Sequence, residues 1–205
     1  MAVGDTDVNI CSTALNLLGE SEISSFSDVS EIAGVCDKLY PGTKNTMLAM
    51  YPWSFATKKV QLAQLSSTPI NEWTYEYQLP SDLIMSGPQA VYNSAATGAS
   101  PITSGWEILT GKLQTDETTI VIDYLFSVDE ASMPPYFVQA LRYAMAAHLA
   151  ELVTDQVEKA DMWHTRLFGV LAENGRGGYL RQAMHMDGRS QIPTRIQTFA
   201  LTDVR

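Results

Sequence analysis

The sequence is poor in the side chains that most often carry out catalysis or bind metal ions. Its 205 residues include two cysteines and three histidines, and only 18% of the residues are charged. It contains no Gly-x-Ser-x-Gly turn, no Gly-x-x-x-x-Gly-Lys-Ser/Thr phosphate loop and no Cys-x-x-Cys or His-Glu-x-x-His spacing. We therefore expect a protein with no enzymatic activity, no cofactor and no metal site.

The two cysteines, Cys11 and Cys36, are too few for a disulfide framework. Each lies on the apolar side of an expected helix, where a free thiol behaves as a small hydrophobic group. A disulfide between them is geometrically possible, but residues 1–5 lack the basic start and apolar run of an export signal. We expect reduced, buried thiols in a protein made in a cytoplasm.

Long apolar runs and clustered positive charge are also missing. No stretch approaches the ~20 apolar residues that cross a bilayer, so no membrane span is expected. The net charge is -10, with +3 in residues 174–205 and -13 in residues 1–173. Because tight nucleic-acid binding needs clustered cations, specific binding to DNA or RNA is not expected.

Two amphipathic segments fill the first fifty residues. Their apolar residues recur every three or four positions: Val8, Cys11, Leu15 and Leu18, then Ile32, Cys36, Leu39, Met47 and Met50. Asp5 or Thr6 can cap the first helix, and Gly19 can close it. Asp28 or Ser30 can cap the second helix. The pattern predicts a helical hairpin.

Pro52 gives this hairpin a defined end. Proline disfavours the helical conformation of the preceding residue, so the second helix should stop before it. Trp53 and Phe55 should then fold back onto the helices. We interpret five aromatic residues as structural anchors rather than ligand contacts: Trp53, Phe55, Trp73, Tyr75 and Trp163.

Between residues 69 and 129 the apolar period changes from 3.6 to 2. Trp73, Tyr75, Tyr77 and Leu79 alternate with polar residues, as do Ile120, Ile122, Tyr124 and Phe126. Shorter strands are expected at 106–109 and 112–114, joined by a tight turn at Thr110-Gly111. Residues 93–100 should form an exposed loop. This region predicts a small antiparallel β domain.

The helical period resumes at Pro134-Pro135, because proline suits a first helical turn. One face of this helix carries Phe137, Leu141, Met145, His148 and Leu152, and small residues recur at Ala140, Ala144, Ala147 and Ala150. Asp155 and Glu158 resemble a capping box for a further helix with Ala160, Trp163, Leu167 and Val170 buried. A break at 174–178 and a short helix at 179–186 should follow.

The predicted fold is α+β and mainly α: a helical bundle built from both chain ends, with an inserted small antiparallel β domain and an extended C-terminal tail. The expected divisions are 1–68 for the hairpin and its anchor, 69–129 for the β domain, 130–187 for the completing helices and 188–205 for the tail. Neither helical half can cover its apolar stripe alone, so the two halves should pack together.

A few polar residues are candidates for chemistry, although each has a plainer interpretation. His148 lies on an apolar helix face and should be a hydrogen-bonded core residue. Asp161 and His164 are one turn apart and could share a metal or a proton, but a surface salt bridge is simpler. Asp129 and Glu130 precede a helix start, where negative charge complements the helix dipole.

The C-terminal segment is the candidate partner-binding region. It combines scattered arginines with apolar residues, and we single out Arg189, Arg195, Ile196, Phe199 and Arg205. They could dock on an acidic neighbour and become ordered upon assembly. The alternative is a frayed tail.

Several motifs resemble tail tubular protein A, the head-to-tail adaptor family of short-tailed, podovirus-like bacteriophages. They are Ala14-Leu15-Asn16-Leu17-Leu18-Gly19, the Ser-Phe-x-Asp-x-Ser-Glu run at 25–31, Pro52-Trp53-Ser54-Phe55-Ala56, the run 73–82, and Pro135-x-Phe137-Val138-x-Ala140-Leu141. The chain departs from the family where an arginine often follows the tyrosine of the second helix by four residues. Here Tyr40 is followed by Pro41 and then Lys44, so this helix should be kinked or split near residue 41. Lysine cannot reproduce the planar fork of arginine.

The resemblance implies a structural virion protein of the viral tail, made in the host bacterial cytoplasm. About twelve copies would form a ring between the portal protein and the tail nozzle protein, and tail fibres can contact such a ring. DNA would pass through during ejection without specific binding, and an acidic channel wall would repel its backbone. The alternative is a small helical protein-binding regulator without enzymatic activity.

Overall fold

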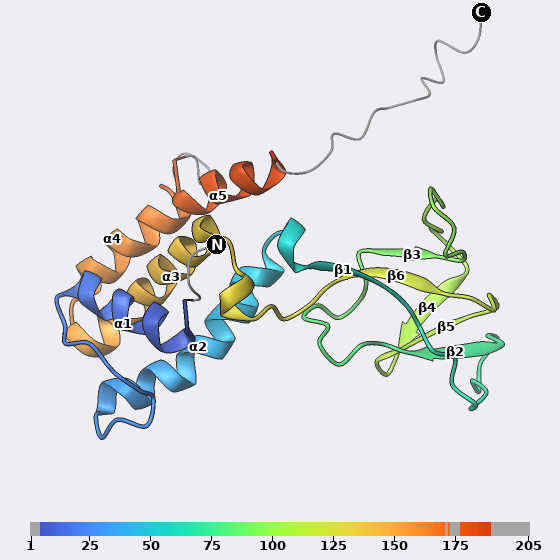
Figure 1. The fold of residues 1–205 in the computed structure, drawn as a ribbon, viewed down its shortest axis with the longest axis horizontal. Coiled ribbons are helices and arrows are strands. Elements are labelled where there is room, and N and C mark those ends of the chain that lie inside the picture. Colours follow the sequence, from blue (N-terminus) through green and yellow to red (C-terminus); the bar gives the residue numbers. More distant parts are fainter. Residues whose placement is uncertain (1–4, 171, 173–176, 190–205) are drawn as a thin grey trace, which may run out of the picture.

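Two units lie at opposite ends of an elongated molecule, one helical and one built of β-strands (Figure 1). The computed structural model describes residues 5–170, 172 and 177–189. The helices are α1 (Asp7–Leu18), α2 (Glu31–Ala49), α3 (Pro135–Thr154), α4 (Val157–Phe168) and α5 (Tyr179–Gly188), with short 3-10 turns η1 (Ser54–Ala56) and η2 (Glu130–Ser132). The predicted α+β, mainly helical class is therefore confirmed. The tail from residue 190 lies outside the described residues.

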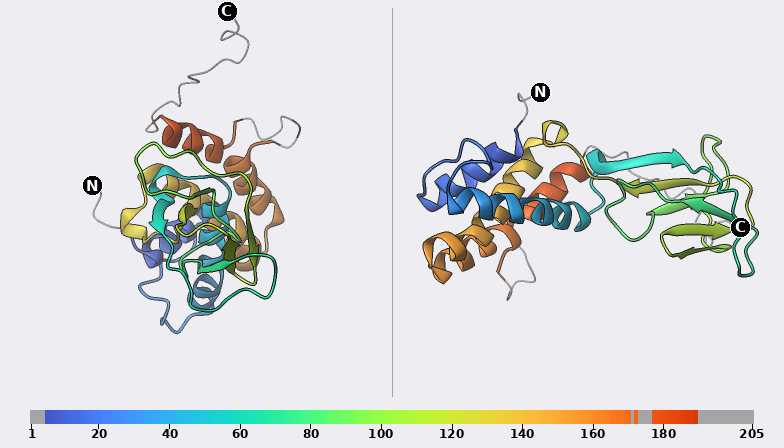
Figure 2. Two further views of the ribbon diagram at one scale, coloured as in Figure 1. Left: turned by 90° about the vertical axis from the view of Figure 1, so that its right-hand side faces the viewer. Right: turned by 90° about the horizontal axis from the view of Figure 1, so that it is seen from below.

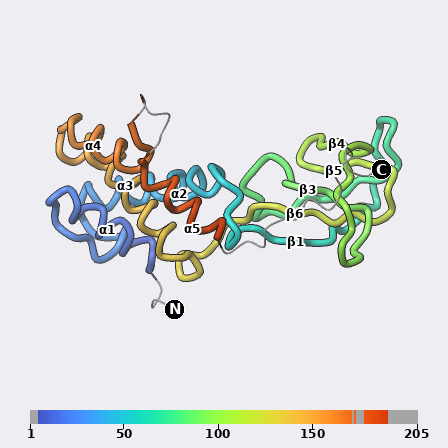
Figure 3. Tube along the Cα trace, turned by 90° about the horizontal axis from the view of Figure 1, so that it is seen from above, coloured from blue at the N-terminus to red at the C-terminus, as the bar shows by residue number. Residues whose placement is uncertain are grey.

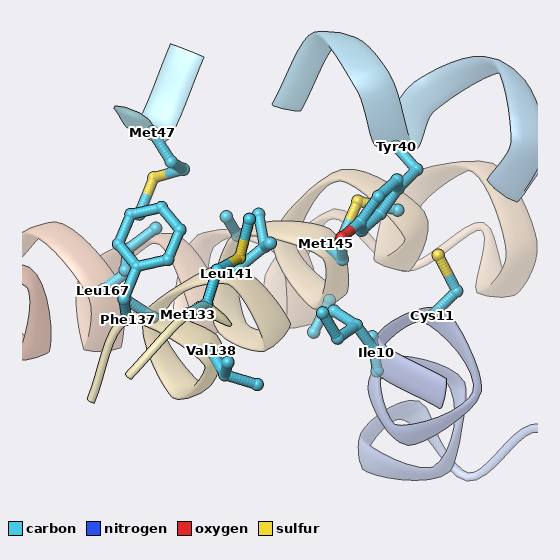
Figure 4. Close-up of a cluster of buried hydrophobic side chains, with 14 of the residues drawn as sticks. Ile10, Cys11, Tyr40, Met47, Met133, Phe137, Val138, Leu141, Met145 and Leu167 are labelled. Atoms are coloured by element: carbon cyan, nitrogen blue, oxygen red, sulfur yellow. The ribbon is translucent and has the colours of Figure 1, made fainter. Parts of the chain in front are cut away.

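Helix α3 is the centre of the helical unit. α1, α2, α4 and α5 all pack against it, whereas α1 and α2 contact each other little. Figure 4 shows side chains of α1 (Ile10, Cys11), α2 (Tyr40, Met47) and α3 (Phe137, Met145) gathered in one apolar cluster. Neighbours on several sides explain why α3 is rich in alanine, since small side chains let helices approach closely. The two chain ends thus build one core around α3.

Four helix ends follow the local sequence. The Thr6 hydroxyl accepts the backbone N–H of Asn9 at 3.2 Å, and Gly19 closes α1 with φ of 85°. The Ser30 hydroxyl accepts the N–H of Ala33 at 3.1 Å. Helix α3 begins at Pro135. These predictions are confirmed because each depends only on neighbouring residues.

The predicted capping box at Asp155 is wrong. Helix α4 begins at Val157, and Asp155 instead ends α3 with φ of 51°. Only two residues separate the helices, so the chain must reverse sharply at Asp155. Aspartate tolerates this left-handed conformation better than most residues.

Helix α2 was expected to be kinked or split near Pro41, and it is not split. The helix runs from Glu31 to Ala49 with the proline inside it. Proline removes one backbone donor, but Cys36, Tyr40 and Met47 are buried on both sides of it. Packing against α3 holds the two halves in one helix.

Three expected core residues of the C-terminal helices are exposed: His148, Leu152 and Val170. The buried side of α3 includes Phe137, Leu141, Met145 and Leu149, which recur every four residues. His148 and Leu152 lie next to this row and not in it. Gly169 ends α4 before Val170, which is 48% exposed. Met50, expected on the stripe of α2, is also 43% exposed.

The β unit contains two three-stranded antiparallel sheets (Figure 2). One has the order β1 (Thr57–Gln61), β6 (Val121–Leu125), β3 (Ala90–Tyr92), and the other β2 (Tyr75–Gln78), β5 (Lys112–Thr115), β4 (Trp106–Leu109). Val60 pairs with Ile122 in the first sheet, and Tyr77 pairs with Leu113 in the second. A second apolar cluster, including Tyr77, Leu113 and Ile122, draws on both sheets.

The β4–β5 hairpin agrees with its prediction, and both turn residues have positive φ, 49° at Thr110 and 74° at Gly111. Strand β1 was not predicted and lies within the segment assigned above to the helical hairpin and its anchor. Its sequence, Thr-Lys-Lys-Val-Gln, shows no apolar alternation because most of the strand is exposed. Pairing with β6 determines this strand.

Candidate interaction surfaces and the junction that positions them

Figure 3 shows the chain passing from the helical unit into β1. An aromatic cluster closes the helical unit at this point. Trp53 is completely buried, and its indole N–H donates to the carbonyl of Met47 at 3.1 Å. Its ring contacts those of Tyr51, Phe55 and Phe137, with centroids 5.0, 5.9 and 5.1 Å away. Because η1 leads directly into β1, this cluster sets the direction in which β1 leaves.

A buried carboxylate joins three segments at the same junction. Asp187, in the last turn of α5, is completely buried. It accepts the backbone N–H of Ser54 at 2.9 Å, the Ser54 hydroxyl at 2.7 Å and the Tyr136 hydroxyl at 2.7 Å. The pKa of Tyr136 is raised, mainly by burial and secondly by its hydrogen bond to Asp187. The start of β1, the start of α3 and the end of α5 are thereby held together.

A second polar contact lies at η2, where the chain returns from β6 to the helical unit. Glu130 accepts the ammonium of Lys44 at 2.8 Å and the hydroxyl of Tyr40 at 3.0 Å. Burial opposes ionisation of Glu130, but hydrogen bonds and the charge of Lys44 outweigh it and lower the pKa. Lys44 therefore ties α2 to η2. Glu130 lies before α3, as expected, but its contact with Tyr40 and Lys44 was not predicted from sequence spacing.

The two crossing segments also pair with each other. Thr57 of β1 lies opposite Leu125 of β6, and the N–H of Phe126 donates to the carbonyl of Ala56 at 3.0 Å. Together with Asp187 and Glu130, this paired neck connects the two units through more than one strand.

The aromatic anchors do not all play the expected part. Trp53 and Trp163 are buried, and Phe55 and Tyr75 are half-buried against the two apolar clusters. Trp73 is half-buried as well, but it belongs to neither cluster. Its indole N–H donates to Glu107 at 3.4 Å. Strand β2 begins at Tyr75. The strand predicted from the alternation of apolar residues therefore begins too early, at Trp73.

A buried polar network on the outer side of β2 was missed. Glu76, expected on a solvent-facing side, is only 4% exposed. It accepts the ammonium of Lys112 at 2.9 Å and hydrogen-bonds to Ser67. Asn71 donates to Gln114, a neighbour of Glu76, at 2.6 Å. The segment leading from β1 to β2 covers this side of the sheet, and no local pattern indicates that cover.

The end of the helical unit far from the β unit is acidic. Exposed carboxylates lie in the connection before α2, at the end of α3 and at the start of α4: Glu22, Asp28, Glu31, Glu151, Asp155, Glu158 and Asp161. Exposed aliphatic side chains lie among them, Val29 fully, and Leu152 and Val157 at 60% and 57%. This acidic end offers both charge and apolar surface to a partner.

A groove of about 300 Å³ lies over α3 between α2 and α4. Ala144 and Ala147 of α3 line it with Met47 and Met50 of α2 and Leu167 and Phe168 of α4. His148, Asp161 and His164 also line it, and all three are exposed. No group of three or more potential metal ligands is found among the described residues. The groove is thus mainly apolar, with a polar rim.

The predicted partner-binding residues lie almost entirely beyond the described part of the chain. Arg189 is exposed directly after α5. Arg195, Ile196, Phe199 and Arg205 lie outside the described residues. In residues 5–170, 172 and 177–189, no helix has the length and hydropathy needed to cross a membrane.

No protein-family model matches the chain, and no curated protein matches it significantly.

Proposed function

We propose that the chain is a structural virion protein, a head-to-tail adaptor of the tail tubular protein A kind in a short-tailed bacteriophage. About twelve copies would form a ring between the portal protein and the tail nozzle protein, with DNA passing through the centre. The five motifs that resemble the family support this proposal. The observation that carries it is the elongated arrangement of a helical unit and a β unit tied by a multiply held neck.

An adaptor must meet different partners at its two ends and keep them in register. In this chain the two ends differ in fold, and the junction at Asp187 and the contact at Glu130 restrain the connection between them. Ring closure also needs a head-to-tail interface between unlike surfaces of identical copies. The acidic end of the helical unit offers one such surface.

The proposal is tested by mixing the purified full-length chain with the portal protein of the same virus. Native mass spectrometry and electron microscopy should show a ring of about twelve copies seated on the portal, even if the chain alone is monomeric. A chain that stays a monomer or dimer and does not bind the portal would instead favour the helical regulator. Labelling of intact virions with an antibody against the chain should mark the junction between head and tail.

A further inference from the structure

The groove over α3 lies between three helices, and no other segment of the described residues lines it. α2 and α4 both pack on α3, and the groove between them has a floor of alanine side chains. Met50 stands 43% exposed on one wall, and Leu167 and Phe168 form part of the other. Small residues at the floor leave room for another segment to approach the backbone of α3.

The described chain ends close to the residue that follows α2, the helix that forms one wall of the groove. A Cβ atom placed on Gly188, the last residue of α5, would lie 3.8 Å from the Tyr51 hydroxyl oxygen. Tyr51 directly follows Met50, which lines the groove. Asp187 is also bonded to Ser54, so the end of α5 is held at this position. The sixteen residues 190–205 therefore follow a helix end that is held near Tyr51, one residue beyond the groove-lining Met50.

These sixteen residues match the groove in length and in apolar spacing. Ile192, Ile196 and Phe199 span seven residues, the same number that separates Met50 from Thr43 along the wall of α2. Seven residues span about 10 Å as a helix and about 23 Å as a strand, so either conformation covers this wall.

Charge also matches the segment to the groove. Arg195 and Arg205 are its basic residues, with Asp203 its only acidic one. Asp161 lines the groove, and Glu158 lies one turn from Asp161 on the same side of α4. If the segment runs from Met50 toward Asp161, its apolar residues lie over the alanine floor of the groove. Its arginines then come toward the carboxylates of α4.

We infer that residues 190–205 dock into the groove of their own molecule, with Ile192, Ile196 and Phe199 against its apolar floor and walls. The groove is then a binding surface for the chain's own C-terminal segment. This inference concerns the isolated chain and goes beyond the proposed function, so it stands or fails whether or not the chain forms a ring.

Hydrogen exchange of the full-length chain and of a chain ending at Arg189 tests the docking. Backbone amides of residues 43–50 and 160–168 should exchange about tenfold or more faster in the shortened chain, while those of β2 and β5 should not change. Met50→Glu should give the same loss of protection in the full-length chain. Met162→Glu is the matched control, because Met162 is 42% exposed but does not line the groove. Equal protection in the full-length and shortened chains would overturn the inference.

A photoreactive residue in place of Ile196 identifies the docking site directly. Mass spectrometry of the irradiated protein should find links to peptides containing Met50 or Leu167 within one chain. Links that join two chains would show that a neighbouring copy supplies the segment and would overturn docking in the same molecule. Links only outside the groove would overturn the site. Circular dichroism confirms that each variant is folded.

Discussion

Ser54 and Asp187 are separated by 133 positions in the sequence, yet two hydrogen bonds join them at 2.9 and 2.7 Å. Ser54 begins the turn that leads to β1, and Asp187 lies in the last turn of the last described helix. Their contact brings the end of the chain to the junction between the two units. The geometry of this junction therefore depends on both halves of the helical unit.

Replacing Asp187 with alanine should destabilise the protein by about 3 kcal/mol, because it removes a completely buried carboxylate and the three hydrogen bonds that Ser54 and Tyr136 donate to it. Urea denaturation followed by circular dichroism measures the change. Asp161→Ala, at an exposed position, is the control and should change the stability by less than about 0.5 kcal/mol. Equal denaturation midpoints for the two variants would contradict the assigned role of Asp187.

Trp53→Ala should lower the free energy of unfolding by about 3–5 kcal/mol, because it removes a completely buried aromatic ring. Trp73→Ala should lower it by less than about 1 kcal/mol, since Trp73 is not fully buried and lies outside both apolar clusters. The pair is compared by urea denaturation under one set of conditions. A larger loss at Trp73 than at Trp53 would reverse our assignment of the main anchor.

The Glu130 contact predicts loss of stability in acid. Its pKa is lower in the folded protein than the ordinary value of 4.5. A carboxyl with a lowered folded pKa stabilises the protein above its unfolded pKa, and this contribution disappears as the pH falls through the folded pKa. In Glu130→Gln the stability should therefore fall less steeply below about pH 4.5 than in the unchanged protein.

Thermal unfolding of both proteins across that pH range measures the difference. Glu158→Gln, at an exposed position of α4, is the control and should retain the slope of the unchanged protein. If Glu130→Gln also retains it, the contact with Lys44 and Tyr40 does not contribute in the way described.

Pro41→Ala should stabilise the protein by about 1–3 kcal/mol. The helix already continues through Pro41, and alanine restores the missing backbone donor and suits a helix interior. Pro41 is exposed, so little packing is lost. Pro101→Ala, at an exposed loop position, should be neutral or slightly destabilising because proline limits the unfolded chain. Melting temperatures of the two variants should move in different directions or by clearly different amounts.

Gly178→Ala should be strongly destabilising, because its Cβ would lie 2.4 Å from the backbone carbonyl carbon of Phe168. The start of α5 lies against the end of α4, and only glycine permits this approach. Gly34→Ala provides the contrast, since no atom lies within 4 Å of its Cβ and alanine favours a helix interior by about 0.5–1 kcal/mol. Urea denaturation should show opposite shifts, and a stable Gly178→Ala variant would refute the close approach.

Features that depend on a few consecutive residues could be read from the sequence. Thr6, Gly19 and Ser30 bound their helices, and Thr110-Gly111 forms the predicted tight turn. The mainly helical α+β class also followed from apolar periodicity, which reports the side of each segment that will be buried. These features were predictable because their physical causes lie within about one helical turn or one hairpin.

Other features arose only when distant segments met. Strand β1 has no apolar alternation and forms by pairing with β6, and Glu76 is buried because another segment covers it. His148 is exposed because α3 advances its buried stripe in four-residue steps against its neighbours. Asp187 gains its partners from η1 and α3, far away in the chain. Burial and pairing of this kind depend on which surfaces come together in space. The sequence of one segment does not indicate which other segment will cover it.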